Sequence, residues 1–140
     1  MENQIIVVDT DVLIDFFSNF TPGAEVVSIL ISRKEAALTS VSIFELYAGV
    51  EGKRRLKQIE TLIQNLTILP LDVIEAVMAG KIYTQLKSKG QMIGTHDILI
   101  AAICLNNDLS LYTKNVAHFS KIDDLQLLSA EEILKLKIDV

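Results

Sequence analysis

The 140-residue chain has one cysteine, two prolines and no tryptophan. Because a single cysteine cannot form a disulfide framework within one chain, a reducing cytoplasm is the expected compartment. The residues before the first apolar segment (1–4) include no Lys or Arg, so we expect no signal peptide. The longest apolar run, residues 98–105, is far shorter than the ~20 residues that a membrane span needs, so no membrane association is expected.

Basic charge is also scarce, since 13 Lys and Arg stand against 18 Asp and Glu and leave a net charge of −5. This balance does not indicate a nucleic-acid-binding domain, which usually carries a basic patch. It does not exclude one, because bound cations would offset part of the acidic charge. One dense basic run, Lys53-Arg54-Arg55 with Lys57, is either a solvated helix face or a phosphate contact.

Hydrophobic residues, in contrast, make up 50% of the chain, which argues against disorder. The length fits one domain spanning residues 1–140. Strand-like and helix-like segments alternate, which predicts an α/β domain with a mostly parallel sheet. The strands are expected at 5–8, 36–39, 66–69, 109–113 and 125–128. The helices are expected from 10, at 24–33, 40–50, 52–65, 72–89 and 95–106, and from 129, where Ser129 and Glu132 match a capping box.

Asp9 stands where the first apolar strand ends. The strand Ile5–Val8 is rich in β-branched residues, as buried strands are. Open α/β sheets bind ligands at the carboxyl ends of their strands, which makes Asp9 a candidate site residue. The alternative is that Asp9 caps the helix beginning at Thr10. Asp11 and Asp15 share one face of that helix, and we expect Asp11 beside the site and Asp15 in solvent.

Glu45 has two open interpretations. The segment Ser42–Glu45 matches the S-x-x-E capping box, in which the glutamate bonds back to the start of its helix. Its neighbours Phe44 and Tyr47 are either core residues, which is the favoured interpretation, or contacts to a partner. A carboxylate among apolar residues is costly to bury unless its charge is compensated. A bound metal ion would provide that compensation.

Asp97 falls in the first turn of a helix that continues with the apolar run 98–105. One interpretation is that Asp97 follows a Thr95 cap and is stabilised by the positive end of the helix dipole, an interaction worth about 0.3–1 kcal/mol. A helix that is apolar all round is buried, however, so its N-terminus points into the interior or a cleft. That placement favours a functional role for Asp97. The adjacent His96 either acts as a general base or only lines the site.

The three acids together predict a cation site. Carboxylate oxygens suit Mg²⁺ or Mn²⁺, which prefer an octahedron of oxygen ligands. Zinc is disfavoured because Cys104 is expected to be buried and because His96 and His118 lack a ligand-like spacing. A cation in such a site would polarise a phosphoryl oxygen and lower the pKa of a bound water.

Four segments carry a family resemblance: Val7–Asp15, Ser42–Gly49, Ile93–Ala102 and Leu111–Phe119. The first resembles a D-T-N-V-L-I-D turn after an opening strand, and the fourth a T-x-N/D segment. Taken together and in order, they make the chain resemble the PIN-domain ribonucleases, most closely the VapC-type toxins of toxin–antitoxin modules. The resemblance implies a PIN-like three-layer α/β/α domain with a central, mostly parallel sheet.

The resemblance also implies roles for individual residues. The metal-binding acids would be Asp9, Glu45 and Asp97, while the fourth acidic position of the family falls on Asn115. Many VapC-type members resemble this chain in having Asn there. An uncharged Asn115 would reach the metal through water or orient the substrate.

Three further positions would surround the acids. Asp11 stands where the family often has Asn and would add negative charge. Thr10 and Thr113 would supply hydroxyls near the phosphate or the acids. The implied activity is hydrolysis of an RNA phosphodiester that leaves a 5′-phosphate and a 3′-hydroxyl. The implied partners are the RNA substrate, a cognate antitoxin that blocks the acidic cleft, and a second copy in a homodimer.

Other functional classes remain open. The D-x-D of Asp9 and Asp11 also resembles that of haloacid-dehalogenase-like phosphatases, with Asp9 as nucleophile. That class needs a later Gly-Asp acidic pair, for which Asp123-Asp124 is a poor substitute. A receiver-like phosphoacceptor module needs an aspartate after the third strand, where only Asp72, an expected helix cap, is near. A binding protein with a dead site is disfavoured by the presence of all three acids.

Overall fold

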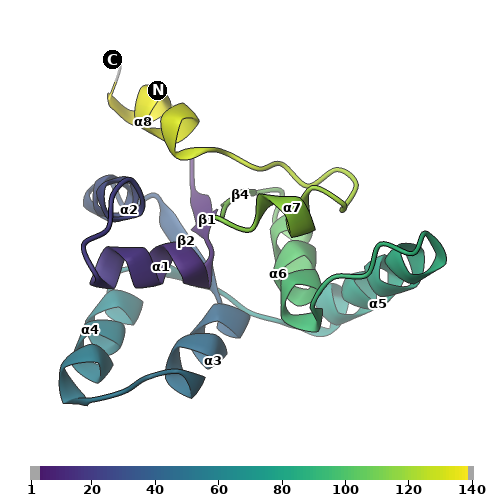
Figure 1. Ribbon diagram of the computed structural model, residues 1–140, viewed down its shortest axis with the longest axis horizontal. Coiled ribbons are helices and arrows are strands. Elements are labelled where there is room, and N and C mark those ends of the chain that lie inside the picture. Colours follow the sequence, from purple (N-terminus) through teal and green to yellow (C-terminus); the bar gives the residue numbers. More distant parts are fainter. Residues whose placement is uncertain (1–3, 139–140) are drawn as a thin grey trace.

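The computed structural model describes residues 4–138, and a four-stranded sheet forms its centre (Figure 1). The strands pair in parallel in the order β3-β2-β1-β4. Their bounds are β1 (Ile6–Val8), β2 (Ala36–Thr39), β3 (Thr67–Leu69) and β4 (Ser110–Tyr112). Parallel strands need crossover connections, and helices provide them here. The predicted α/β class and mostly parallel sheet are confirmed.

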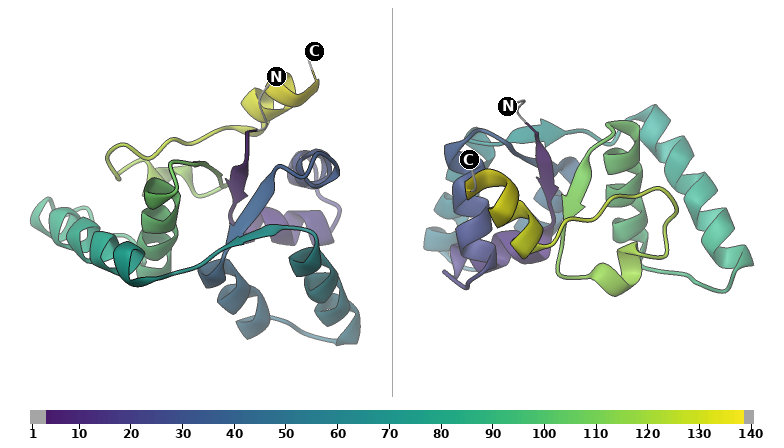
Figure 2. Two further views of the ribbon diagram at one scale, coloured as in Figure 1. Left: turned by 180° about the vertical axis from the view of Figure 1, so that it is seen from behind. Right: turned by 90° about the horizontal axis from the view of Figure 1, so that it is seen from above.

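Helices cover both faces of the sheet and give it three layers (Figures 1 and 2). They are α1 (Thr10–Phe17), α2 (Gly23–Ser32), α3 (Ser40–Ala48), α4 (Lys53–Gln64), α5 (Val73–Ser88), α6 (Thr95–Asn106), α7 (Val116–Phe119) and α8 (Ala130–Ile138). Side chains of β1 alternate between the two cores: Ile6 and Val8 pack with α1, α2, α4 and α8, whereas Val7 packs with α5 and α6.

Helix α6 is buried on nearly all sides, as its apolar sequence predicts. Its interior residues Ile100 to Cys104 have no solvent exposure, and α5 packs along it. Burial raises the pKa of the Cys104 thiol to about 12, so this cysteine is a packing residue, as expected. None of the helices between residues 4 and 138 has the length and apolar character needed to cross a bilayer.

One predicted strand is wrong, and two predicted helix caps are present. Residues 125–128 form no strand: Leu127 makes a single parallel bridge to Leu111, at the edge of β4.

The helix that begins after Asp72 has the capping box with Glu75. The box at Ser129 and Glu132 is also formed, by bonds of 2.9 and 3.1 Å. Short-range sequence patterns therefore located helix starts better than the last strand.

The register between β1 and the edge strand β4 fixes where the site lies. Val8 of β1 pairs with Tyr112 of β4, so the next residues, Asp9 and Thr113, leave the sheet side by side. The backbone N–H of Asp9 donates to the Tyr112 carbonyl at 3.0 Å. Helix α3 follows β2 directly and contacts α1 and α6. The carboxyl edge of the sheet therefore gathers residues from α1, α3, α6 and the segment after β4.

A second polar cluster lies at the opposite edge, where the strands begin. Glu35, 1% exposed, precedes β2, and its carboxylate accepts from the Gln4 N–H, from Arg33 Nε at 2.9 Å and from Lys137 Nζ at 3.1 Å. Lys137 belongs to α8 and is also buried. This cluster ties the last helix to the amino edge of the sheet.

Candidate active site

Asp9 is both a helix cap and a buried acid. One carboxylate oxygen accepts from the Thr10 N–H at 2.8 Å, which caps α1, and the other accepts from the Thr113 hydroxyl at 2.7 Å. The residue is 5% exposed. Burial, followed by the charge of Asp11, raises the Asp9 pKa to about 7 despite these hydrogen bonds, with Asp97 adding to the rise. The two interpretations of Asp9 from sequence are therefore compatible.

Asp11 lies beside Asp9 and is incompletely satisfied. Its Oδ2 accepts from the Lys114 N–H at 3.0 Å, but its Oδ1 is buried without a hydrogen-bond partner among residues 4–138. Burial raises the Asp11 pKa. The expectation that Asp15 is solvated is wrong, because its carboxylate pairs with Lys114 Nζ at 3.0 Å and its side chain is only 15% exposed.

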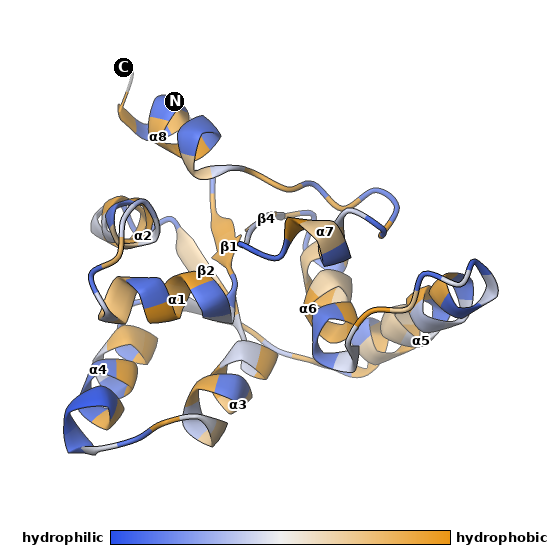
Figure 3. Ribbon diagram, in the orientation of Figure 1, coloured by the Kyte–Doolittle hydropathy of each residue, from blue (hydrophilic) through white to orange (hydrophobic). Residues whose placement is uncertain are grey.

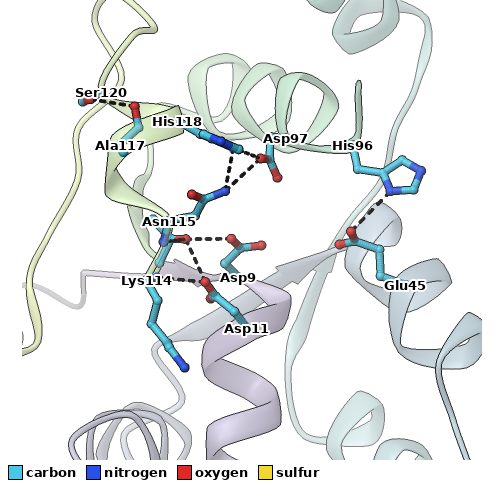
Figure 4. A network of polar contacts seen from close by, with 11 residues as sticks. Asp9, Asp11, Glu45, His96, Asp97, Lys114, Asn115, Ala117, His118 and Ser120 are labelled. Carbon is cyan, nitrogen blue, oxygen red and sulfur yellow. Dashed lines mark hydrogen bonds and ion pairs between the residues drawn. The ribbon is translucent and has the colours of Figure 1, made fainter. Parts of the chain in front are cut away.

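Glu45 points across from α3 to α1 and α6 (Figure 4). Its Oε1 accepts from the Thr10 hydroxyl at 2.6 Å, and its Oε2 lies 3.3 Å from His96 Nδ1. The capping-box interpretation of Ser42 is wrong, since α3 begins at Ser40 and Thr39 is its N-cap. The S-x-x-E spacing instead places Ser42 and Glu45 on one face, where both contact Thr10.

Asp97 forms the other side of the site with two residues from the segment after β4. Its Oδ2 lies 3.1 Å from Asn115 Nδ2 and 3.1 Å from His118 Nδ1, and the same two nitrogens are 2.8 Å apart (Figure 4). The expected Thr95 cap is absent. The N-cap of α6 is Gly94, which has no side chain to accept a hydrogen bond, and Thr95 is the first residue of the helix. Asp97 therefore sits at an open helix start that faces other polar groups.

Thr113 joins the two halves of the site. Its hydroxyl donates to Asp9 and accepts from the Asn115 N–H at 3.0 Å, and Asn115 in turn contacts Asp97. The structure thus brings all eight sequence-predicted site residues to one edge of the sheet: Figure 4 labels six of them, and Thr10 and Thr113 bond to Glu45 and Asp9. At this edge, Asp9, Thr113, Asn115 and Asp97 form one chain of contacts, while Glu45, Thr10 and His96 form an adjoining group.

Three contacting residues were not predicted. His118 was set aside for its spacing from His96, but it stands three residues after Asn115, which brings both onto one side of the short α7 turn. Lys114 lies in the same segment after β4, and its N–H and its Nζ each contact an aspartate of α1. Ser42, expected as a helix cap, contacts Thr10 instead. The only sequence signal for His118 and Lys114 is that both lie in the segment directly after β4, close to Asn115.

The donor set fits a hard divalent cation. The side chains at this edge of the sheet carry carboxylate and amide oxygens, the ligands that Mg²⁺ and Mn²⁺ prefer. The raised pKa of Asp9 and the orphaned Oδ1 of Asp11 both mark negative charge that the described residues leave uncompensated. No three His, Cys, Asp or Glu side chains of residues 4–138 are already gathered around one point. Glu45 and Asp97 would have to turn from His96 and His118 toward Asp9.

Thr10 offers a test of how Glu45 is held. Thr10→Val removes the hydroxyl that bonds Glu45 while keeping the β-branched shape, so we expect about a 10-fold loss of catalytic efficiency on whatever substrate the site turns over. Thr10→Ser keeps the hydroxyl and should retain most activity. Measured kcat/KM values that are equal for the valine variant and the wild type would show that Thr10 does not position Glu45.

Comparison with known proteins identifies the family. The PIN domain pattern matches residues 6–125. Ribonuclease VapC1 of Rickettsia felis is 35% identical over 102 residues, covering 68% of this chain and 76% of its own. Ribonuclease VapC1 of Haemophilus influenzae strain R2866 is 31% identical over 128 residues, covering 88% of this chain and 96% of its own.

The fold agrees with these matches. VapBC2 of Rickettsia felis, solved bound to a DNA fragment from its promoter, superposes with a TM-score of 0.79 at 23% identity over 90% of this chain and 98% of that one. At 23% identity the superposition shows a shared fold and nothing more. The PIN pattern and the two relatives, however, cover most of the sequence, and the chain therefore belongs to the PIN-domain family, in its VapC group.

Proposed function

We propose that the protein is a Mg²⁺- or Mn²⁺-dependent endoribonuclease, a single PIN-like domain that acts as the toxin of a toxin–antitoxin module. The observation that carries the proposal is Asp9, a buried carboxylate with a pKa near 7 at the carboxyl edge of the sheet, beside Asp11 and Asp97. The names of the relatives as VapC ribonucleases support the reaction class. Its setting would be the cytoplasm, where RNA and antitoxin are both present.

The proposed roles follow the contacts. Asp9, Glu45 and Asp97 would hold the ion, with Asn115 contributing through water. The bound ion would polarise a phosphoryl oxygen of the RNA and lower the pKa of a water. Thr113 fixes the orientation of Asp9, and Thr10 fixes that of Glu45. Because the Asp9 pKa is about 7, a fraction of the molecules carries a proton on Asp9 at neutral pH. Binding of a cation would release this proton.

The rival functions lose support in the structure. A phosphatase would need a second acidic pair beside Asp9, but Asp123 pairs instead with Lys89, the C-cap of α5, at 3.5 Å. A receiver module would need a free aspartate after β3. Asp72, the candidate, is instead engaged in the capping box of α5. Neither residue belongs to the group of contacts around Asp9.

Metal dependence is tested by removal and return of the ion. The purified protein should cleave single-stranded RNA with Mg²⁺ or Mn²⁺ and stop when EDTA is in excess, and the products should carry 5′-phosphate ends. Re-addition of Mg²⁺ should restore cleavage. Activity that persists in EDTA after exhaustive chelation would contradict the role given to the acids.

A protein partner would block the same site. Solved structural neighbours include a toxin–antitoxin complex from Klebsiella pneumoniae and a member of the VapBC family of toxin–antitoxin systems from Mycobacterium tuberculosis. By analogy we propose that a cognate antitoxin offers an Arg or Lys to the carboxylates here. An unpaired acid cluster attracts cationic side chains. Asp97→Asn should weaken the complex measured by calorimetry. A partner that bound wild type and variant equally, and far from the cleft, would contradict this assignment.

A homodimer is the remaining proposal. Support comes from the start of α5, where Val73, Ile74 and Val77 are 72%, 63% and 54% exposed. Exposed apolar residues that cluster on one helix are typical of interaction surfaces. Light scattering should give twice the chain mass of 15.5 kDa. A monomer at micromolar concentration would contradict the proposal.

A further inference from the structure

Two aromatic rings meet beside the proposed acids. Phe44 of α3 lies with its ring centroid 5.5 Å from that of His96, which begins α6, and the ring planes make an angle of 78°. The prediction that Phe44 is a core residue is wrong, because it is 57% exposed, and Tyr47, one turn further on, is 42% exposed.

The position of the Phe44 ring is constrained. An edge-to-face contact engages either the edge or one face of Phe44, so at least one face of its ring is free of His96. His96 is itself held through Nδ1 by Glu45 Oε2 at 3.3 Å. The pair therefore spans from α3 to α6 next to Glu45, and Phe44 within it remains 57% exposed.

We propose that Phe44, supported by His96, is a stacking subsite for one unpaired base of the RNA, next to the phosphate that the acids act on. The inference rests on the proposed ribonuclease function and adds the form of the substrate: single-stranded RNA whose base is turned out of its stack. Proteins recognise such RNA by stacking bases on aromatic side chains. Stacking tolerates any base, because each has a flat face.

The surroundings favour a nucleotide over a protein partner. Phe44 adjoins the polar groups of Glu45 and His96, whereas a docked protein helix would need a continuous apolar groove. At the start of α4, which follows α3, Lys53, Arg54 and Lys57 are exposed, whereas Arg55 is half-buried over the Phe17 ring. This end of α4 is hydrophilic in Figure 3. Its cations could follow the phosphate backbone in a chain whose net charge is otherwise negative.

Binding measurements separate this subsite from the catalytic proposal. All variants carry Asp9→Asn and EDTA is present, so that no cleavage occurs. Two fluorescein-labelled probes are compared by anisotropy: a 12-nucleotide single-stranded RNA, and a ribose-phosphate oligomer of equal length without bases. We expect Phe44→Leu to weaken RNA binding about 5-fold or more and to leave the abasic probe unchanged, since only the base is lost from the ring. Phe44→Trp should bind RNA at least as well as Phe44.

The outcomes decide whether Phe44 binds an RNA base or a protein partner. The inference is overturned if the leucine variant binds RNA as the parent does, if it loses both probes equally, or if the parent binds neither. If Phe44→Leu leaves RNA binding unchanged and weakens only the complex with the cognate antitoxin, Phe44 contacts the protein partner and the inference is overturned. Because Phe44 is exposed, equal melting temperatures are expected for these variants. In a separate assay with Mg²⁺, if the protein without Asp9→Asn cleaves no RNA while the binding result holds, the proposed function fails and the subsite stands.

Discussion

Asp9→Asn is expected to make the protein more stable above neutral pH while removing its activity. In the folded protein the Asp9 pKa is about 7, against 3.8 for an unperturbed aspartate. Between these two values the folded state binds more protons at Asp9 than the unfolded state, so stability falls as pH rises through this window. A difference of about 3 units corresponds to up to about 4 kcal/mol. Asparagine carries no charge and escapes this cost.

The gain should depend on pH in a defined way. Without metal, in EDTA, the asparagine variant should exceed the wild type in free energy of unfolding by about 2–4 kcal/mol at pH 8. The difference should shrink as pH falls and vanish well below the unfolded pKa of 3.8, where the wild-type residue is protonated in both states. Urea unfolding at several pH values measures both. A wild type that matches the variant at pH 8 would show that Asp9 is ionised without strain.

Asp72 provides a matched control for the helix-capping role. Both aspartates accept from the next backbone N–H at 2.8 Å and begin a helix, but Asp72 is exposed. Asparagine caps helices about as well as aspartate, so neither substitution should cost the cap. Asp72→Asn should therefore leave both activity and the pH profile of stability near wild type. If Asp72→Asn reproduced the effects of Asp9→Asn, the cap and not the site would explain them.

Glu35→Ala is expected to destabilise the protein by about 3–5 kcal/mol at pH 7, because it leaves the Lys137 ammonium buried without its carboxylate. Burial alone raises the Glu35 pKa, but hydrogen bonds from Lys137, the Gln4 N–H and Arg33 outweigh it and leave the pKa below its usual value. A lowered pKa gives stability that is present above the unfolded value of about 4.5 and lost as pH falls through the folded value.

Two companions make the Glu35 prediction specific. The difference between wild type and Glu35→Ala should shrink on acidification below pH 4.5, as measured by urea unfolding. Adding Lys137→Met removes the stranded charge and should recover much of the loss, since a buried pair can often be replaced by apolar groups. A double variant as unstable as the single one would mean that packing at Glu35, rather than charge, holds α8.

The sequence predicted the acids of the site because each stands at a boundary that local patterns mark. Asp9 follows a β-branched strand, and Asp97 opens an apolar helix, and both boundaries are where predicted. The parallel sheet then follows from alternation, and its register places Asp9 beside Thr113.

Partners set by tertiary contact were harder to predict. The S-x-x-E spacing at Ser42 fits both a helix cap and one face of a helix, and only the contact with Thr10 distinguishes them. His118 reaches Asp97 because a short turn after β4 folds back over α6, which no periodicity signals. The failed strand at 125–128 has the apolar composition of a strand, but only one of its residues, Leu127, pairs with an edge strand.

The most direct test of the central claim compares RNA cleavage by the wild type, Asp9→Asn, Asp97→Asn and Asp72→Asn, each purified and assayed with Mg²⁺. The account predicts that wild type and Asp72→Asn cleave alike. It predicts that the two site variants lose at least about 100-fold in rate, because each removes a charge that would hold the ion. Equal cleavage by all four proteins would contradict the assignment of Asp9 and Asp97 to a metal-dependent ribonuclease site.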